Sequence, residues 1–91
     1  MSTDITHDRA ARRFETTVEG ALCELAYQLD DRVMTITHTG VPARVGGRGL
    51  AAALVEKALA TARSEGWKVV PACSYAEVWM RRHPDFDDLR A

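Results

Sequence analysis

Residues 35–51 carry the pattern that most constrains how this chain folds. A run of β-branched residues stops at Gly40–Pro42, a stretch rich in arginine and glycine follows, and an apolar periodic segment begins at Leu50. A helix that starts in this way leaves its first backbone N–H groups without intrahelical partners, at the positive end of its dipole. Glycine lets the backbone approach an anion closely and adopt positive φ. The segment therefore predicts a strand, a loop and a helix that together bind a phosphate-like anion.

The loop itself fits the pattern R-x-x-G-x-G over residues 44–49. Its glycines are Gly46, Gly47 and Gly49, and we expect the side chains of Arg44 and Arg48 to converge on the same anion.

Two other phosphate-binding patterns fit less well. A Walker A loop needs Gly-Lys-Ser/Thr at its end, whereas Leu50 follows Gly49, so nucleoside triphosphate hydrolysis is disfavoured. The dinucleotide pattern G-x-G-x-x-A fits residues 47–52, but the next strand ends in Val70–Cys73 without the acid that would hold a ribose. The chain is also too short for a doubly wound nucleotide domain.

Composition narrows the class of protein. The 91 residues suffice for one domain with a small core, and 12 Lys plus Arg against 13 Asp plus Glu leave a formal charge of -1. This balance gives no support for nucleic-acid binding. Cys23 and Cys73 are too few and too far apart in sequence for a disulfide framework or a zinc site, so we expect no metal and reduced thiols in a cytoplasmic protein. The sequence shows no signal-peptide core and no apolar run of membrane-spanning length, so we expect no membrane association.

Periodicity divides the chain into a polar tail and one domain. We expect residues 1–12 to form a flexible tail and residues 13–91 to form the domain. Alternating and β-branched patterns predict three antiparallel strands, joined at Glu19-Gly20 and at Asp30-Asp31. These strands are expected at Arg13–Val18, Ala21–Leu29 and Arg32–Thr39.

The second half of the chain predicts a crossover. An apolar stripe at helical spacing marks the main helix at Leu50–Ser64, which Gly66 caps, and Trp67–Pro71 favours a strand parallel to the third one. Residues Tyr75 to Arg82 predict a short helix that ends before Pro84. The fold class is therefore α/β, in the mixed α+β sense: a mostly antiparallel sheet with one parallel pair, one main helix and one short C-terminal helix.

Three side chains near the end of the parallel pair are candidates for chemistry. Cys73 follows the last strand, where its thiol is either buried and inert or, beside a helix start, a nucleophile or acid. Alternation places His38 on the same side as Met34 and Ile36, either as a satisfied strand histidine or as a base toward Cys73 or a substrate amine. Tyr75 either packs on the sheet or donates a proton to a leaving thiolate.

The ordered run of motifs resembles the small acetyltransferase-like family within the GCN5-related N-acetyltransferase (GNAT) superfamily. The resemblance covers about residues 13–89. The residues that carry it are His38-Thr39-x-Val41-Pro42, the loop of residues 44–49, Leu50-Ala51-x-x-Leu54-Val55, Ala58-Leu59-x-x-Ala62-Arg63, Val69-Val70-Pro71-x-Cys73-x-Tyr75 and His83-Pro84.

The resemblance implies a minimal GNAT fold whose parallel strands splay apart around acetyl-CoA. It implies that the backbone of Val45–Gly49 holds the CoA pyrophosphate, that the pantetheine lies along Ile36–Thr39, and that the thioester points toward Cys73. The residues it assigns to cofactor binding are Thr39, Val41, Arg44, Val45, Gly46, Gly47, Arg48, Gly49 and Tyr75.

The resemblance also implies a reaction, the transfer of acetyl from acetyl-CoA to an amine such as a protein lysine. Cys73 and His38 are then the catalytic candidates, with Cys73 acting as an acid or as a transient acyl-cysteine. This chain lacks the flanking helices that build the acceptor site in full-size enzymes, and one hypothesis is that a homodimer or another partner supplies the missing walls. The alternatives are a module that binds or senses CoA thioesters without turnover, and an interaction domain whose glycine loop only starts a helix.

Overall fold

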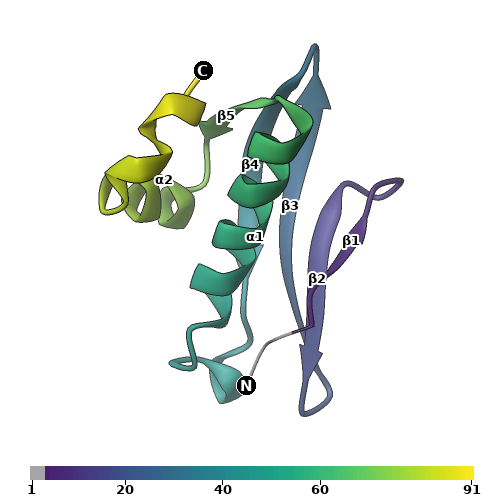
Figure 1. Ribbon diagram of the computed structural model, residues 1–91. Coiled ribbons are helices and arrows are strands. Elements are labelled where there is room, and N and C mark those ends of the chain that lie inside the picture. Colours follow the sequence, from purple (N-terminus) through teal and green to yellow (C-terminus); the bar gives the residue numbers. More distant parts are fainter. Residues whose placement is uncertain (1–3) are drawn as a thin grey trace.

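The computed structural model describes residues 4–91 and is built on a five-stranded sheet of order β1-β2-β3-β4-β5 (Figure 1). Neighbouring strands are antiparallel except β4 and β5, which are parallel. The strands are β1 (Thr6–Asp8), β2 (Arg13–Val18), β3 (Ala21–Asp30), β4 (Val33–Gly40) and β5 (Lys68–Pro71). The predicted mixed fold with a single parallel pair is confirmed.

One face of the sheet is covered by α1 (Leu50–Glu65), which crosses β3 and β4 (Figure 1). Its buried stripe, which includes Leu54 and Leu59, packs on Leu25 and Ile36, and all four side chains are fully buried. Burial of apolar area is the main driving force here. The predicted helix is confirmed to within one residue. Gly66 ends it at φ 77°, where its N–H bonds to the carbonyls of the last turn.

The β2–β3 and β3–β4 hairpins close through two-residue turns in which both residues have positive φ. Glu19 and Gly20 have φ of 50° and 75° and join β2 to β3, as the sequence predicts. Asp31 and Arg32, at 49° and 65°, join β3 to β4. Such type I′ turns match the right-handed twist of the strands they connect. The second turn was predicted one residue too early, because Asp30 still pairs with Val33.

An irregularity in β4 changes which side chains share a face. Ile36 pairs with Tyr27 and His38 pairs with Ala26, so Thr37 is an extra residue in the ladder. Cross-strand partners lie on the same face of a sheet, and a bulge of this kind reverses the alternation beyond it. Ile36 stays under α1, whereas His38 turns to the open face and is exposed. The predicted placement of His38 on the side of Ile36 is wrong for this reason.

The segment expected to be a flexible tail contributes a strand. Residues 1–3 lie outside the described residues, but Thr6–Asp8 pairs with β2 as β1. The His7 ring stacks on Phe14 with centroids 4.1 Å apart, and its Nε2 lies 2.6 Å from the Tyr27 hydroxyl. These contacts hold the three-residue edge strand in place, although its polar sequence gives no sign of them. Regular structure therefore begins before Arg13.

The C-terminal part returns to the edge of β5. The short helix α2 (Ser74–Arg81) is followed by the 3-10 helix η2 (Pro84–Leu89), which sequence periodicity did not predict. The His83 ring stacks on Trp79 at 3.7 Å, and the backbone N–H of Ala91 donates to the Val69 carbonyl over 3.0 Å. This return stabilises β5 on the side away from β4, and α2 is held near the carboxyl end of the sheet's parallel pair.

Candidate active site

The parallel strands β4 and β5 stay together for only part of their length. Their pairing runs from Val33 opposite Lys68 to Ile36 opposite Pro71. One further bond follows, in which the Cys73 N–H donates to the Ile36 carbonyl over 2.9 Å, and the chain then leaves as α2. β4 continues to Gly40 without β5 beside it. The two strands therefore diverge at Cys73, as the splayed pair of the resemblance implies.

The glycine-rich loop begins with a 3-10 turn, η1 (Ala43–Val45). Within it, the Val45 N–H donates to the Pro42 carbonyl over 3.1 Å, and the Gly46 N–H donates to the Ala43 carbonyl over 3.0 Å. The Val45 side chain is fully buried. These two amides are therefore already used within the loop, and the donors left for an anion lie further along the chain than the expected range that starts at Val45.

The remaining donors belong to the second half of the loop and the first turn of α1. The Ala53 N–H donates to the Gly49 carbonyl over 3.0 Å, so the amides of residues 50–52 precede the first intrahelical bond. They surround a hollow of about 260 Å³. The hollow is lined by Val41, Gly46, Gly47, Gly49, Leu50, Ala51, Ala52 and Tyr75.

Two glycines in this wall have the conformation that the sequence argument requires. Gly47 and Gly49 both have φ of 77°, and a Cβ built on either would meet no atom within 4 Å. The backbone there faces open space, so a ligand can approach it closely. Backbone donors at a helix N-terminus in such a setting fit the phosphates of CoA.

The two arginines of the loop lie beside the β2–β3 turn. Arg48 forms an ion pair with Glu19, and the Nη2 atom of Arg44 lies 3.6 Å from a Cβ built on Gly20. The hydrogen bond from Arg48, and then its charge, lower the pKa of Glu19. Sequence reasoning missed Glu19. The predicted strand order could have indicated it, because a β2–β3 turn lies at the same end of the sheet as the loop that follows β4 (Figure 1).

Cys73 sits at the N-cap of α2, and its sulfur lies 3.6 Å from the Thr39 hydroxyl oxygen. Thr39 pairs with Leu25 beyond the bulge, which places it on the covered face. Burial acts to raise the pKa of the Cys73 thiol, but hydrogen bonds from the Ala76 backbone, the Thr39 hydroxyl and the Tyr75 backbone outweigh it, and the pKa is lowered. The environment therefore favours the thiolate.

Of the other candidates, Tyr75 joins this arrangement and His38 lies on the opposite face. Tyr75 is 40% exposed and lines the hollow, two residues beyond Cys73. The His38 ring lies over Gly40, where a built Cβ would approach its Nε2 to 2.8 Å. The structure thus brings Thr39 to Cys73, and not His38. Within residues 4–91, no group of three or more His, Cys, Asp and Glu side chains could hold a metal ion.

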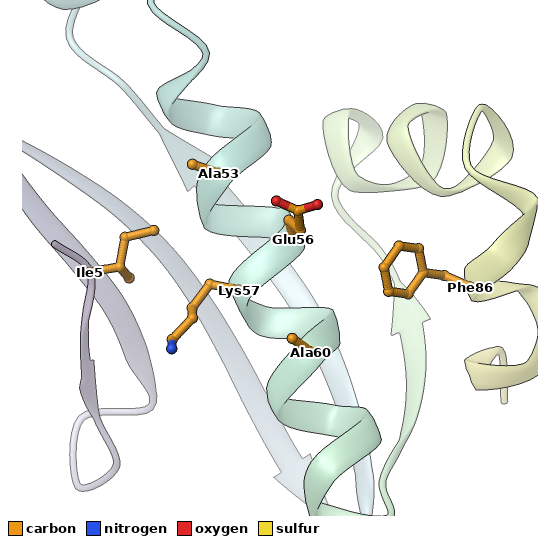
Figure 2. Close-up of a pocket in the computed structure, with 6 residues that line it drawn as sticks. All are labelled: Ile5, Ala53, Glu56, Lys57, Ala60 and Phe86. Atoms are coloured by element: carbon orange, nitrogen blue, oxygen red, sulfur yellow. The ribbon is translucent and has the colours of Figure 1, made fainter. Parts of the chain in front are cut away.

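A second, wider hollow of about 510 Å³ lies on the solvent side of α1 (Figure 2). It is lined by Ile5, Ala53, Glu56, Lys57, Ala60 and Phe86. Figure 2 shows Ile5 and Phe86 on opposite sides of α1, with the Lys57 side chain on the side of Ile5. This hollow contains neither the glycine loop nor Cys73, so it is separate from the candidate active site. No helix in the part of the chain that the structure describes is long and apolar enough to cross a membrane.

Comparison with known proteins gives three findings. The sequence pattern of the GCN5-related N-acetyl-transferase family matches residues 13–89. The chain is 30% identical to Protein NATD1 of Mus musculus over 83 residues, which cover 88% of this chain and 76% of NATD1. The solution structure of a GCN5-like protein from Staphylococcus aureus superposes with a TM-score of 0.77 at 26% identity, covering 100% of this chain and 91% of that one.

Proposed function

Because the chain belongs to the GCN5-related N-acetyltransferase family, we propose that it binds acetyl-CoA and transfers the acetyl group to an amine acceptor. The observation that carries this proposal is the hollow at the start of α1. It is lined by two positive-φ glycines that face open space and by the first residues of α1, whose N–H groups lack intrahelical partners, beside the diverging ends of β4 and β5.

The phosphate end of CoA is assigned to the glycine loop. The amides of residues 50–52, the backbone of Gly47 and Gly49, and the guanidinium groups of Arg44 and Arg48 supply donors and positive charge. The pantetheine is assigned to the edge of β4 near Thr39 and Val41, which β5 leaves unpaired. This arrangement would direct the thioester toward Cys73.

The reactive end is assigned to Cys73. When bound, the thioester supplies an activated acetyl group. In its thiolate form, which the lowered pKa makes easier to reach, the Cys73 sulfur would attack the acetyl carbonyl carbon and release the CoA thiolate, which takes a proton. The acceptor amine would then attack the acetyl-cysteine, lose a proton and restore the thiolate. In the alternative route the amine attacks the thioester directly, and the Cys73 thiol or the Tyr75 hydroxyl protonates the leaving CoA thiolate.

His38 is the proposed base for the acceptor amine. It lies on the open face of the sheet, opposite the face covered by α1. An amine would therefore reach the thioester from that open face, at the end where β4 and β5 diverge. We place the protein in the cytoplasm, in keeping with Cys23 and Cys73, which are both free thiols. A second copy of the chain is the proposed source of missing acceptor-site walls.

Calorimetric titration with acetyl-CoA and with CoA tests the cofactor, and intact mass after incubation with acetyl-CoA tests the route. We expect both ligands to bind, and we expect an added acetyl group that Cys73→Ala abolishes while the affinity is kept. Binding with acetyl transfer to an amine but no protein-bound acetyl would assign the direct route. Binding without any transfer would leave a CoA-thioester-binding module, and no binding would refute the proposal.

A further inference from the structure

The ion pair between Glu19 and Arg48 joins two segments that lie 29 residues apart in the chain. Glu19 is the first residue of the β2–β3 turn, and Arg48 lies between the two positive-φ glycines of the loop. Both side chains are partly exposed, Arg48 at 43% and Glu19 at 60%. A carboxylate is thus held against one of the two arginines of the loop whose glycines line the hollow at the start of α1.

The turn fixes the backbone from which this carboxylate extends. Glu19 has φ of 50° and Gly20 has φ of 75°, so both residues occupy the left-handed region and the strands on either side are paired up to Val18 and Ala21. Type I′ turns favour Asn, Asp or Gly at the first position, and a glutamate there is unusual. The carboxylate therefore extends from a two-residue turn between paired strands rather than from a long loop.

We propose that Glu19 competes with the phosphates of a bound CoA thioester for Arg48, and so sets the affinity of the hollow for its anion. This inference rests on the proposed function. A guanidinium offers the same fork of donors to a carboxylate and to a phosphate, so Arg48 cannot give its full set to both. A displaced Glu19 carboxylate would also stay near the phosphates and repel them.

The second arginine of the loop is placed differently. Arg44 lies beside Gly20 and makes no ion pair in the described part of the chain. It would therefore attract phosphate without first giving up a carboxylate, while Arg48 exchanges Glu19 for the ligand. Release of CoA would be accompanied by the return of Arg48 to Glu19.

The test is Glu19→Asn, which removes the carboxylate and suits the left-handed turn. We expect CoA to bind about two- to fivefold more tightly, the range that corresponds to an exposed ion pair. The gain should shrink as salt is raised, because salt screens exposed charges. Affinity is measured by calorimetry with CoA and, on the same variants, by NMR titration with inorganic pyrophosphate.

Asp31→Asn is the matched control. Asp31 occupies the first position of the other type I′ turn, at the opposite end of the sheet (Figure 1), so this variant loses the same charge in the same backbone setting. We expect its CoA affinity to be unchanged. In an Arg48→Gln background, Glu19→Asn should lose most of its effect, because the residue for which Glu19 competes is gone.

The outcomes separate the two proposals. If the wild type binds CoA and Glu19→Asn binds it equally or more weakly, Glu19 does not compete for Arg48 and the inference is wrong. If the wild type binds no CoA, the proposed cofactor is wrong, and the pyrophosphate titration decides the inference alone. Tighter pyrophosphate binding by Glu19→Asn then supports it, and equal or weaker binding overturns it.

Discussion

At the scale of single residues, the contact between Cys73 and Thr39 depends on the bulge in β4. Without a bulge at Thr37, strict alternation from Ile36 would place His38 on the covered face and Thr39 on the open face, away from the thiol. The sequence pointed to Cys73 and the glycine loop as candidates because both follow local rules for strand ends and helix starts. It missed the face of His38 and the neighbour of Cys73, because a run such as Thr-Ile-Thr-His-Thr has the same alternation with or without a bulge.

Thr39→Val should raise the pKa of Cys73, because the hydroxyl that donates to the thiolate is lost. We expect the pH profile of Cys73 alkylation by iodoacetamide to move to higher pH, with slower alkylation near neutral pH. Thr39→Ser keeps the hydroxyl and should restore the wild-type profile. An unchanged profile in Thr39→Val would show that the 3.6 Å contact has no effect on the thiol. Cys23 is fully buried and should stay unmodified in the folded protein.

Gly47→Glu should abolish CoA binding, because it directs a carboxylate into the space from which phosphate would approach the backbone. Gly47→Asn is the control at the same φ of 77°, since asparagine tolerates the left-handed region and carries no charge. Calorimetry with CoA compares the two, and thermal unfolding measures the backbone cost that they share. Equal CoA affinity in Gly47→Glu and wild type would remove the loop from the binding site.

At the scale of elements, α1, α2 and β2 to β5 were predictable, and β1 and η2 were not. α1 and the Glu19-Gly20 turn follow from apolar spacing and turn chemistry. β1 and η2 are held mainly by contacts with residues distant in sequence, such as His7 with Tyr27 and Arg63 with Asp88. A pattern confined to a few residues cannot report such contacts, so the sequence assigned one of these elements to a tail and left the other out.

The docking of β1 should weaken on acidification. Burial, and then the charge of Arg9, lower the pKa of His7 from its ordinary value of 6.5. The unfolded state then binds more protons than the folded state, so the free energy of unfolding falls as the pH drops below about 6.5. The fall continues until the pH passes the lowered pKa.

Unfolding by urea between pH 5 and 8 measures this effect in wild type and in His7→Gln, which cannot titrate. We expect the free energy of unfolding of His7→Gln to differ less between pH 5 and pH 8 than that of wild type. The same pH dependence in both proteins would assign it to other groups. His83→Gln serves as a matched histidine replacement on the opposite side of the fold.

At the scale of the whole molecule, a two-layer domain of 91 residues has little excess stability. Its core lies between α1 and one sheet face, and Leu54 is fully buried there. Leu54→Ala should lower the free energy of unfolding by about 2 to 5 kcal/mol, from lost burial plus the cavity left behind. Urea unfolding checks this value, and Ala60→Ser on the solvent side of α1 should stay close to wild type. A loss below about 1 kcal/mol would mean that the core refills the space.

The class of fold could be predicted because three strands are followed by a helix and then by another strand, and a strand–helix–strand order implies one parallel crossover. What could not be predicted is the assembly of the site at one end of the sheet. Glu19, Arg48 and the start of α1 meet there only because the hairpins bring separate segments together. The charge balance of the sequence does not indicate that these segments lie together.

The left-handed turns also bear on the order in which the chain folds. Glu19, Asp31 and Arg32 all hold positive φ without being glycine, so neither turn has the Asn-Gly or Asp-Gly pair that favours a type I′ hairpin most strongly. We expect the nucleus to form where α1 collapses on β3, with the turns closing after the rate-limiting step. Glu19→Asn should then slow unfolding and leave the folding rate almost unchanged in stopped-flow measurements. Faster folding in that variant would place the β2–β3 turn inside the nucleus, and the turn that holds Arg48 would then be among the first parts of the molecule to form.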